Sequence, residues 1–120
     1  MQHLEFTLPL KMNYDFRRAY RKGRSAAEPC LVVYARRNNS PGSRVGFTVS
    51  KKLGCAVVRN KVRRRLREIY RLNEHSLRAG FDIVVVARNR SVAADYRRLE
   101  REFLRACAGL GILREETKET

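Results

Sequence analysis

Residues 44–68, RVGFTVSKKLGCAVVRNKVRRRLRE, change from one hydrophobic period to another and so decide the fold. In the first part apolar residues alternate, with Val45, Phe47 and Val49 on one face, as in a half-buried strand. From about residue 56 they recur every three or four positions, which predicts an amphipathic helix over about 56–73. Its expected buried stripe comprises Val58, Val62, Leu66, Ile69 and Tyr70.

The flanking sequence predicts four further elements. These are helices over about 13–22 and 95–108 and strands over 31–36 and 81–88. The strands at 31–36 and 44–50 are expected to form a hairpin around Pro41 and Gly42. The order α-β-β-α-β-α predicts an α+β fold, a two-layer sandwich of helices against a small mixed sheet. A chain of 120 residues is one domain, here with a flexible arm over about 1–12 and a flexible tail over about 114–120.

The positive charge is concentrated in one stretch. The chain has 27 Lys and Arg against 12 Asp and Glu, a formal charge of +15. Residues 16–67 hold 16 basic residues and one acid, Glu28, and therefore the whole excess. Such a surface attracts polyanions, because neutralising phosphates releases counterions. A GC-rich genome would explain why 21 of the basic residues are Arg, but not the missing acids. Nucleic acid is the favoured partner, and an acidic protein or an anionic membrane is the alternative.

Several protein classes do not fit the sequence. The longest apolar run is Cys30–Ala35, far below the roughly 20 residues that span a bilayer. The first ten residues lack a signal-peptide pattern. The three cysteines form no CxxC pair, which suits reduced thiols in a cytoplasm. We therefore expect a cytoplasmic protein without a membrane partner.

The basic helix carries the densest candidate site. Arg59, Arg63 and Arg67 share one row at a spacing of four, and Asn60 and Arg64 lie in the next. Like charges at this spacing destabilise a helix, so a helix with a purely structural role would interleave Glu. Arg binds phosphate through two parallel hydrogen bonds, so the row favours an RNA or DNA backbone over a merely solvated face. Asn60 is placed to read a base edge or to hold a hydrated metal ion.

Aromatic residues beside basic ones form a second candidate site. Phe16 and Tyr20 lie one helical turn apart, and Tyr34 lies on a strand. Single strands bind by stacking bases on rings while the backbone follows positive charge. Tyr20 and Tyr34 suit a groove, Phe16 fits either a groove or the core, and Lys51 and Lys52 would close the groove.

The residues of an independent active site are missing. His3 and His75 are the two histidines, and no Cys or His cluster has zinc spacing. No Gly-rich phosphate loop is present, and the acids form no metal-binding pair. Cys55 lies beside the basic helix, where the pKa of a thiol can be lowered, but a buried thiol is the favoured reading. The sequence reads as a binding module.

The same residues resemble a known family. A strand, then Ser-Lys-Lys-x-Gly, then Ala-Val-x-Arg-Asn-Lys opening a basic helix is similar to the protein subunit of bacterial ribonuclease P. FRRAY at 16–20, KGRS at 22–25 and FDIVVVAR at 81–88 resemble the same family. The resemblance covers about residues 13–108.

The resemblance implies a fold, a partner and a reaction. It implies a left-handed β-α-β crossover, an exception to the usual hand, and a short extra strand near residues 24–26. The partner would be the catalytic ribonuclease P RNA, which removes the 5′ leader from precursor tRNA with Mg²⁺ bound mainly by the RNA. The protein would have no catalytic residue, and no protein oligomer is implied.

The resemblance also assigns roles to residues. Those facing the catalytic RNA would be Arg59, Asn60, Lys61, Arg63, Arg64 and Arg67. Those in the leader-binding cleft would be Phe16, Tyr20, Tyr34, Lys51 and Lys52. Relatives often have Phe where this chain has Tyr20, so a hydroxyl is added at the cleft. The subunit would strengthen substrate binding and reduce the Mg²⁺ requirement; the alternative is a structural ribosomal RNA-binding protein without a processing role.

Overall fold

The computed structural model of the chain describes residues 7–114. The strands are β1 (Thr7–Pro9), β2 (Arg24–Ala27), β3 (Leu31–Arg37), β4 (Ser43–Thr48) and β5 (Phe81–Ala87). The α-helices are α1 (Asn13–Lys22), α2 (Ala56–Asn73) and α3 (Tyr96–Leu110). Three short 3₁₀ turns are η1 (Lys51–Leu53), η2 (Glu74–Ser76) and η3 (Asn89–Ser91). None of the described helices is both long enough and apolar enough to cross a membrane.

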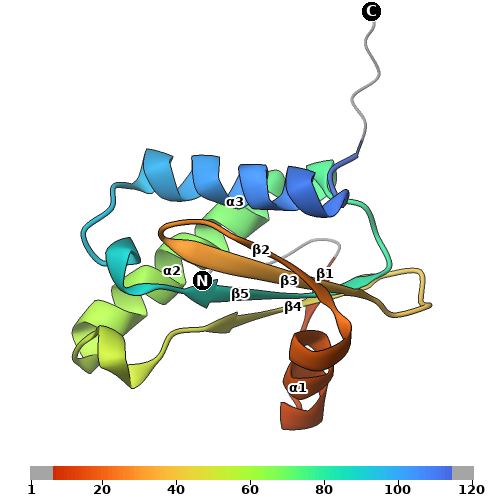
Figure 1. The fold of residues 1–120 in the computed structure, drawn as a ribbon, viewed down its shortest axis with the longest axis horizontal. Coiled ribbons are helices and arrows are strands. Elements are labelled where there is room, and N and C mark those ends of the chain that lie inside the picture. The colour runs from red at the N-terminus through yellow and green to blue at the C-terminus, as the bar shows by residue number, and fades with distance from the viewer. Residues whose placement is uncertain (1–6, 115–120) are drawn as a thin grey trace, which may run out of the picture.

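The five strands form one mixed sheet in the order β1-β4-β5-β3-β2. Helices α2 and α3 pack on one face of the sheet, and α1 lies against the other face (Figure 1). The α+β class and the small mixed sheet are thus confirmed. The position of α1 means that the second face is partly covered as well.

The predicted hairpin is wrong, because β5 lies between β3 and β4. It pairs antiparallel with β3 and parallel with β4. Residues 82–85 are all buried, since both faces of β5 are covered. A strand buried on both faces is most stable in the centre of a sheet, where each edge also finds a partner. Helix α2 then connects the parallel neighbours β4 and β5 as a β-α-β unit.

The edges of the sheet correct the predicted arm. From Thr7 onward the arm is structured: β1 pairs parallel with β4, and the Leu10 N–H donates to the Val45 carbonyl at 2.9 Å. Pro9 is tolerated there because an edge strand can do without one N–H. At the other edge β2 forms the extra strand that the resemblance implied. The remainder of the arm, residues 1–6, and residues 115–120 of the predicted tail lie outside the described residues.

The main core lies between the sheet and helices α2 and α3. Four members of the predicted stripe are buried there, with Val58 half-buried: Val62, Leu66, Ile69 and Tyr70. Asp95 is the N-cap of α3, and its carboxylate accepts a hydrogen bond from the Arg98 N–H at 2.8 Å. The helix buries Leu99 and Phe103. This cap gives a hydrogen-bond acceptor to one backbone N–H of the first turn that has no partner within the helix.

A smaller core cluster fixes α1 to the opposite face. Its buried members are Leu10, Ala19 and Val84, with the rings of three half-buried aromatics packed against them: Phe16, Tyr20 and Tyr34. This cluster places the predicted aromatic residues beside the sheet, so the candidate site depends on how α1 is held.

Candidate RNA interface

An open groove of about 450 Å³ runs between α1, β4 and α2, and we call it the α1–α2 groove. It brings together residues from three elements far apart in the sequence. Its lining comprises Asn13, Phe16, Arg17, Tyr20, Phe47, Thr48, Val49 and Arg63. The groove thus joins aromatic rings of α1 and β4 to basic side chains of α1 and α2.

Phe16 is both core and groove wall, which resolves the two readings of this residue. Its ring lies over Gly46 of β4, so closely that a Cβ at position 46 would be 2.3 Å from Phe16 Cζ. The same half-buried ring lines the groove. Glycine is therefore required at position 46 by the approach of the ring.

Tyr20 is held in the groove wall from two sides. Its hydroxyl hydrogen-bonds Thr48 Oγ1 at 2.8 Å, so the hydroxyl that this chain adds is engaged by the sheet. Its ring packs edge-on against Tyr34, with centroids 4.9 Å apart. Tyr34 does not line the groove itself but contacts Tyr20 edge to face, an arrangement that aromatic pairs prefer.

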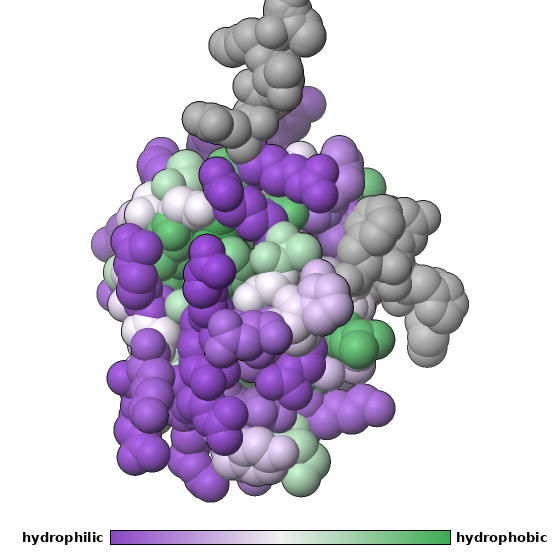
Figure 2. Space-filling view, turned by 90° about the vertical axis from the view of Figure 1, so that its right-hand side faces the viewer, coloured by the Kyte–Doolittle hydropathy of each residue, from purple (hydrophilic) through white to green (hydrophobic). Residues whose placement is uncertain are grey.

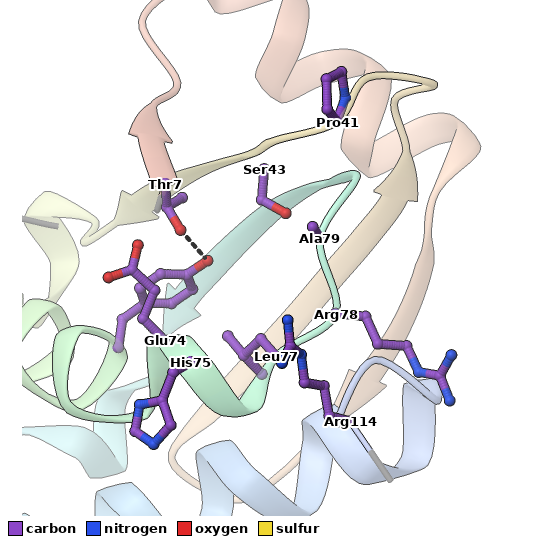
Figure 3. Close-up of a pocket in the computed structure, with 10 residues that line it drawn as sticks. Thr7, Pro41, Ser43, Glu74, His75, Leu77, Arg78, Ala79 and Arg114 are labelled. Atoms are coloured by element: carbon purple, nitrogen blue, oxygen red, sulfur yellow. Dashed lines mark hydrogen bonds between the residues drawn. The ribbon is translucent and has the colours of Figure 1, made fainter. Parts of the chain in front are cut away.

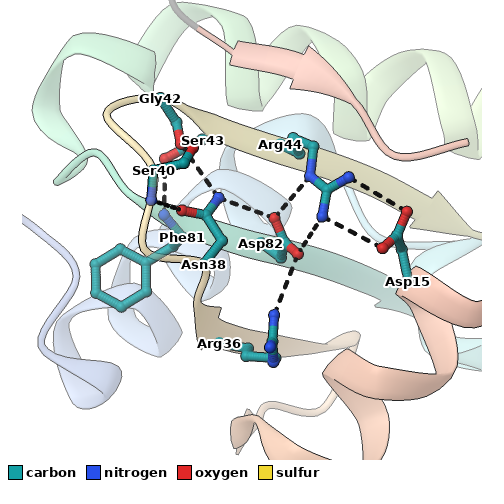
Figure 4. Close-up of polar contacts among 9 residues, drawn as sticks. All are labelled: Asp15, Arg36, Asn38, Ser40, Gly42, Ser43, Arg44, Phe81 and Asp82. Atoms are coloured by element: carbon teal, nitrogen blue, oxygen red, sulfur yellow. Dashed lines mark hydrogen bonds and ion pairs between the residues drawn. The ribbon is translucent and has the colours of Figure 1, made fainter.

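An ion network anchors α1 to the sheet (Figure 4). Arg44 of β4 donates from Nε and Nη2 to the buried Asp82 carboxylate at 2.9 and 2.7 Å. It also donates to the buried Asp15 of α1 at 3.2 Å. Asn38 donates to Asp82 at 3.0 Å, and Arg36 approaches the same carboxylate at 3.7 Å. These bonds compensate the two buried carboxylates for the water that they lose on folding. They also hold α1 against the sheet, because Arg44 of β4 binds Asp15 of α1.

The pairing of these acids with Arg44 was missed by sequence reasoning, because Asp15 and Asp82 lie 67 positions apart in the chain. The available signal was a carboxylate within an otherwise apolar strand, which requires a partner when buried. Burial by itself raises the pKa of Asp82, but hydrogen bonds from Arg44 and Asn38 outweigh it and hold that pKa below its usual value.

Two members of the predicted arginine row, Arg63 and Arg67, lie on the groove side of α2. Arg63 lines the groove, and the Arg67 guanidinium lies 5.5 Å from the centre of the Phe47 ring. Arg59 Nε donates to the Gly54 carbonyl at 3.1 Å, and Arg63 Nη1 donates to Asn60 Oδ1 at 3.3 Å. The row is therefore partly fixed by neighbouring groups.

The charges of the predicted helix set are not neutralised by any carboxylate of residues 7–114. Within residues 7–114, none of its five basic members pairs with a carboxylate: Arg59, Lys61, Arg63, Arg64 and Arg67. The helix's one acid, Glu68, binds Arg71 at 2.7 Å. Asn60, Lys61 and Arg64 are exposed. This face can bind phosphates without first breaking an ion pair.

Lys51 and Lys52 lie in η1, directly between β4 and α2, and both are exposed. The structure does not bring them into the lining of the α1–α2 groove. Their role in closing the cleft stays a prediction.

Cys55 is exposed, so the expectation of a buried thiol is wrong. It stands at the N-cap of α2, next to the first backbone N–H groups of the helix, although its side chain makes no capping hydrogen bond. The nearby backbone N–H groups of Val58 and Val57 stabilise the thiolate and so lower the pKa of the Cys55 thiol. The other two cysteines, Cys30 and Cys107, are buried and free.

A second hollow of about 340 Å³ lies at the other end of α2 (Figure 3). Tyr70 hydrogen-bonds Thr7 at 3.1 Å in its wall, and Glu74, His75 and Arg78 border it. It contains none of the predicted site residues. Among residues 7–114 no group of three or more His, Cys, Asp or Glu side chains is arranged to hold a metal ion.

Comparisons with known proteins identify relatives over most of the chain. The family model described as Ribonuclease P matches residues 4–111. The ribonuclease P protein component of Natranaerobius thermophilus is 46% identical over 96 residues, covering 80% of this chain and 84% of that protein. The component of Clostridioides difficile is 45% identical over 98 residues, covering 81% and 86%.

Solved structures of RNase P proteins have the same fold as this chain. The RNase P protein of Staphylococcus aureus is 33% identical with a TM-score of 0.81, covering 88% of this chain and 97% of that one. The RNase P protein of Thermotoga maritima is 34% identical with a TM-score of 0.74, covering 81% and 92%. The sequence, the groove beside a basic helix and these matches agree: the chain belongs to the ribonuclease P protein family.

Proposed function

We propose that this ribonuclease P protein holds the 5′ leader of precursor tRNA in the α1–α2 groove while its partner, the ribonuclease P RNA, performs the cleavage. Membership of the family makes the chain a subunit of ribonuclease P that acts in tRNA processing. The observation that carries the finer proposal is the groove itself, where Arg63 of the basic helix meets the aromatic wall of α1. The same family membership favours processing over a purely ribosomal role.

The groove suits a single RNA strand better than a duplex. Its wall presents the rings of Phe16, Tyr20 and Phe47 for stacking, with Arg17 and Arg63 beside them for phosphates. Stacking is tolerant of base identity because every base has a π-face, which suits leaders of varied sequence. Lys51 and Lys52 would extend the positive charge along the strand.

The exposed side of α2 is the proposed contact with the catalytic RNA. Asn60, Lys61 and Arg64 point to solvent there, next to the row formed by Arg59, Arg63 and Arg67. Since the two RNAs repel each other, unpaired positive charge between them strengthens substrate binding. The same charge reduces the concentration of Mg²⁺ that is needed.

The described residues do not fit a resident Mg²⁺. Three of their four buried carboxylates, Asp15, Asp82 and Glu102, are each bound by an arginine, and no cluster of suitable ligands is present among residues 7–114. We therefore assign the ion to the RNA subunit and the protein's part to binding. As a partner in tRNA processing, the protein would work in the cytoplasm.

The direct test mixes the protein with a bacterial ribonuclease P RNA and a labelled precursor tRNA at low Mg²⁺, omitting each component in turn. We expect cleavage at the mature 5′ end to require the RNA and to be stimulated by the protein. Cleavage by the protein alone would refute catalysis by the RNA. Binding without stimulation would refute the processing role.

The contact with the catalytic RNA is tested by its salt dependence. Replacing Arg59, Arg63 and Arg67 with Ala should reduce the slope of log K against log salt for assembly by about 2, at about 0.7 per phosphate. The matched control replaces three exposed arginines without an ion pair among the described residues, namely Arg90, Arg97 and Arg101. Equal slopes for the two triple variants would refute the assignment.

A further inference from the structure

We infer that the outer face of α1 is a second binding surface for single-stranded RNA, and that it takes the part of the leader distal to the nucleotides in the groove. The inference rests on the proposed function. We call this surface the α1 shelf. It is a shallow hollow of about 220 Å³ lined by Tyr14, Arg17, Arg18, Arg21 and Lys22.

The aromatic residue of the shelf has no role in the core. Tyr14 is 50% exposed, although large apolar side chains elsewhere on α1 pack against the sheet. The Arg18 guanidinium lies 5.6 Å from the centre of the Tyr14 ring. An exposed ring with an arginine beside it offers one face for base stacking and one group for the adjoining phosphate.

The charges of the shelf are free to bind phosphate. Among residues 7–114, none of its four basic side chains has a carboxylate partner. The helix's one acid, Asp15, faces the sheet and holds Arg44. Positive charges at helical spacing repel one another, so an isolated helix would gain from interleaved acids that this one lacks. Hydrophilic side chains accordingly gather over α1 at the lower part of the face shown in Figure 2.

The shelf is continuous with the α1–α2 groove. Arg17 lines both hollows, so it forms the ridge between them. An RNA strand that crosses Arg17 out of the groove meets the shelf between Tyr14 and Arg21, which lie one turn from Arg17 in opposite directions along the helix. This continuity favours the distal leader over an unrelated acidic partner.

The test compares precursor tRNAs with a short leader of about 5 nucleotides and a long leader of about 15, a span that covers common single-strand site sizes. Holoenzyme affinity is measured with the wild-type protein, with Tyr14→Ala, and with the double variant Arg18→Ala/Arg21→Ala. The control is Arg97→Ala/Arg101→Ala, which removes the same charge from exposed positions on α3, across the sheet from α1.

We expect each shelf variant to weaken binding of the long leader about fivefold, the lower end of the loss for one stacked base, and to leave the short leader unchanged. The control should change neither. Equal loss for both leaders, no loss, or the same loss in the control would each refute the shelf. Tyr20→Ala tests the groove separately, because it should weaken both leaders. If the wild-type protein gives no preference for precursor over mature tRNA, the proposed function fails as well.

Discussion

Gly46→Ala is the most direct probe of how the sheet shapes the groove. The new Cβ would lie 2.3 Å from Cζ and 2.5 Å from Cε1 of the Phe16 ring. Carbon atoms rest at about 3.5–4.0 Å, so the ring must withdraw by more than about 1 Å. The buried cluster behind α1 leaves little room in that direction. We therefore expect the ring to shift into the groove that it lines.

The expected cost follows from overpacking. Added methyl groups in a packed region destabilise by about 1–3 kcal/mol. Urea denaturation should therefore show a free energy of unfolding about 2 kcal/mol lower for Gly46→Ala. Precursor tRNA should also bind more weakly, while mature tRNA is unaffected, because the displaced ring obstructs the leader.

The chain supplies a matched control for this substitution. In Gly109→Ala, on α3, the new Cβ meets no atom within 4 Å, so helix propensity should instead stabilise the protein by up to about 1 kcal/mol. Adding Phe16→Leu to Gly46→Ala should restore part of the lost stability, and the coupling in this double-mutant cycle should exceed about 0.5 kcal/mol. If Gly46→Ala unfolds like Gly109→Ala, the close packing of Phe16 on β4 is refuted.

Three further predictions concern other parts of the structure. Asp82→Asn removes one partner of a buried ion network and should lower the free energy of unfolding at neutral pH by about 3 kcal/mol. Because the folded pKa of Asp82 lies below its unfolded value near 3.9, its contribution is present above about pH 4 and lost as pH falls through the folded pKa; equal acid sensitivity of variant and wild type would contradict this. Tyr34→Ala removes the support behind Tyr20 and should reduce the preference for precursor over mature tRNA without weakening binding of the catalytic RNA; an equal loss for both tRNAs would place Tyr34 outside leader recognition. A thiol reagent should label Cys55 alone in the native protein and all three cysteines in urea, with Cys55→Ser as control, since the other two are buried; rapid native labelling of more than one thiol would contradict that burial.

Much of the local structure followed from the sequence. The spacing of apolar residues predicted the helix at Ala56–Asn73 with the bounds that the structure shows. Alternation and β-branched content predicted the strands later found as β3, β4 and β5, within a residue or two at each end. These features depend on neighbours a few positions apart, so a single sequence contains them.

The chemistry of the candidate site also followed from the sequence in outline. The basic stretch and the aromatic residues of α1 predict a single-strand RNA interface. The groove brings Phe16 and Tyr20 together with Arg63, which the sequence had placed in two separate candidate sites. Tyr34 and the two lysines do not line it, because side-chain direction at a groove depends on the packing of its walls.

Only the tertiary structure decided the order of the strands and the way α1 is held. The apolar run of β5 indicates a largely buried strand, but its insertion between β3 and β4 depends on contacts between segments far apart in the chain. The ring of Phe16 on Gly46, the carboxylates of Asp15 and Asp82 on Arg44, and the exposed thiol of Cys55 are likewise tertiary features. The spacing of residues along one chain encodes local periodicity, whereas contacts between distant segments depend on which surfaces the folded chain brings together.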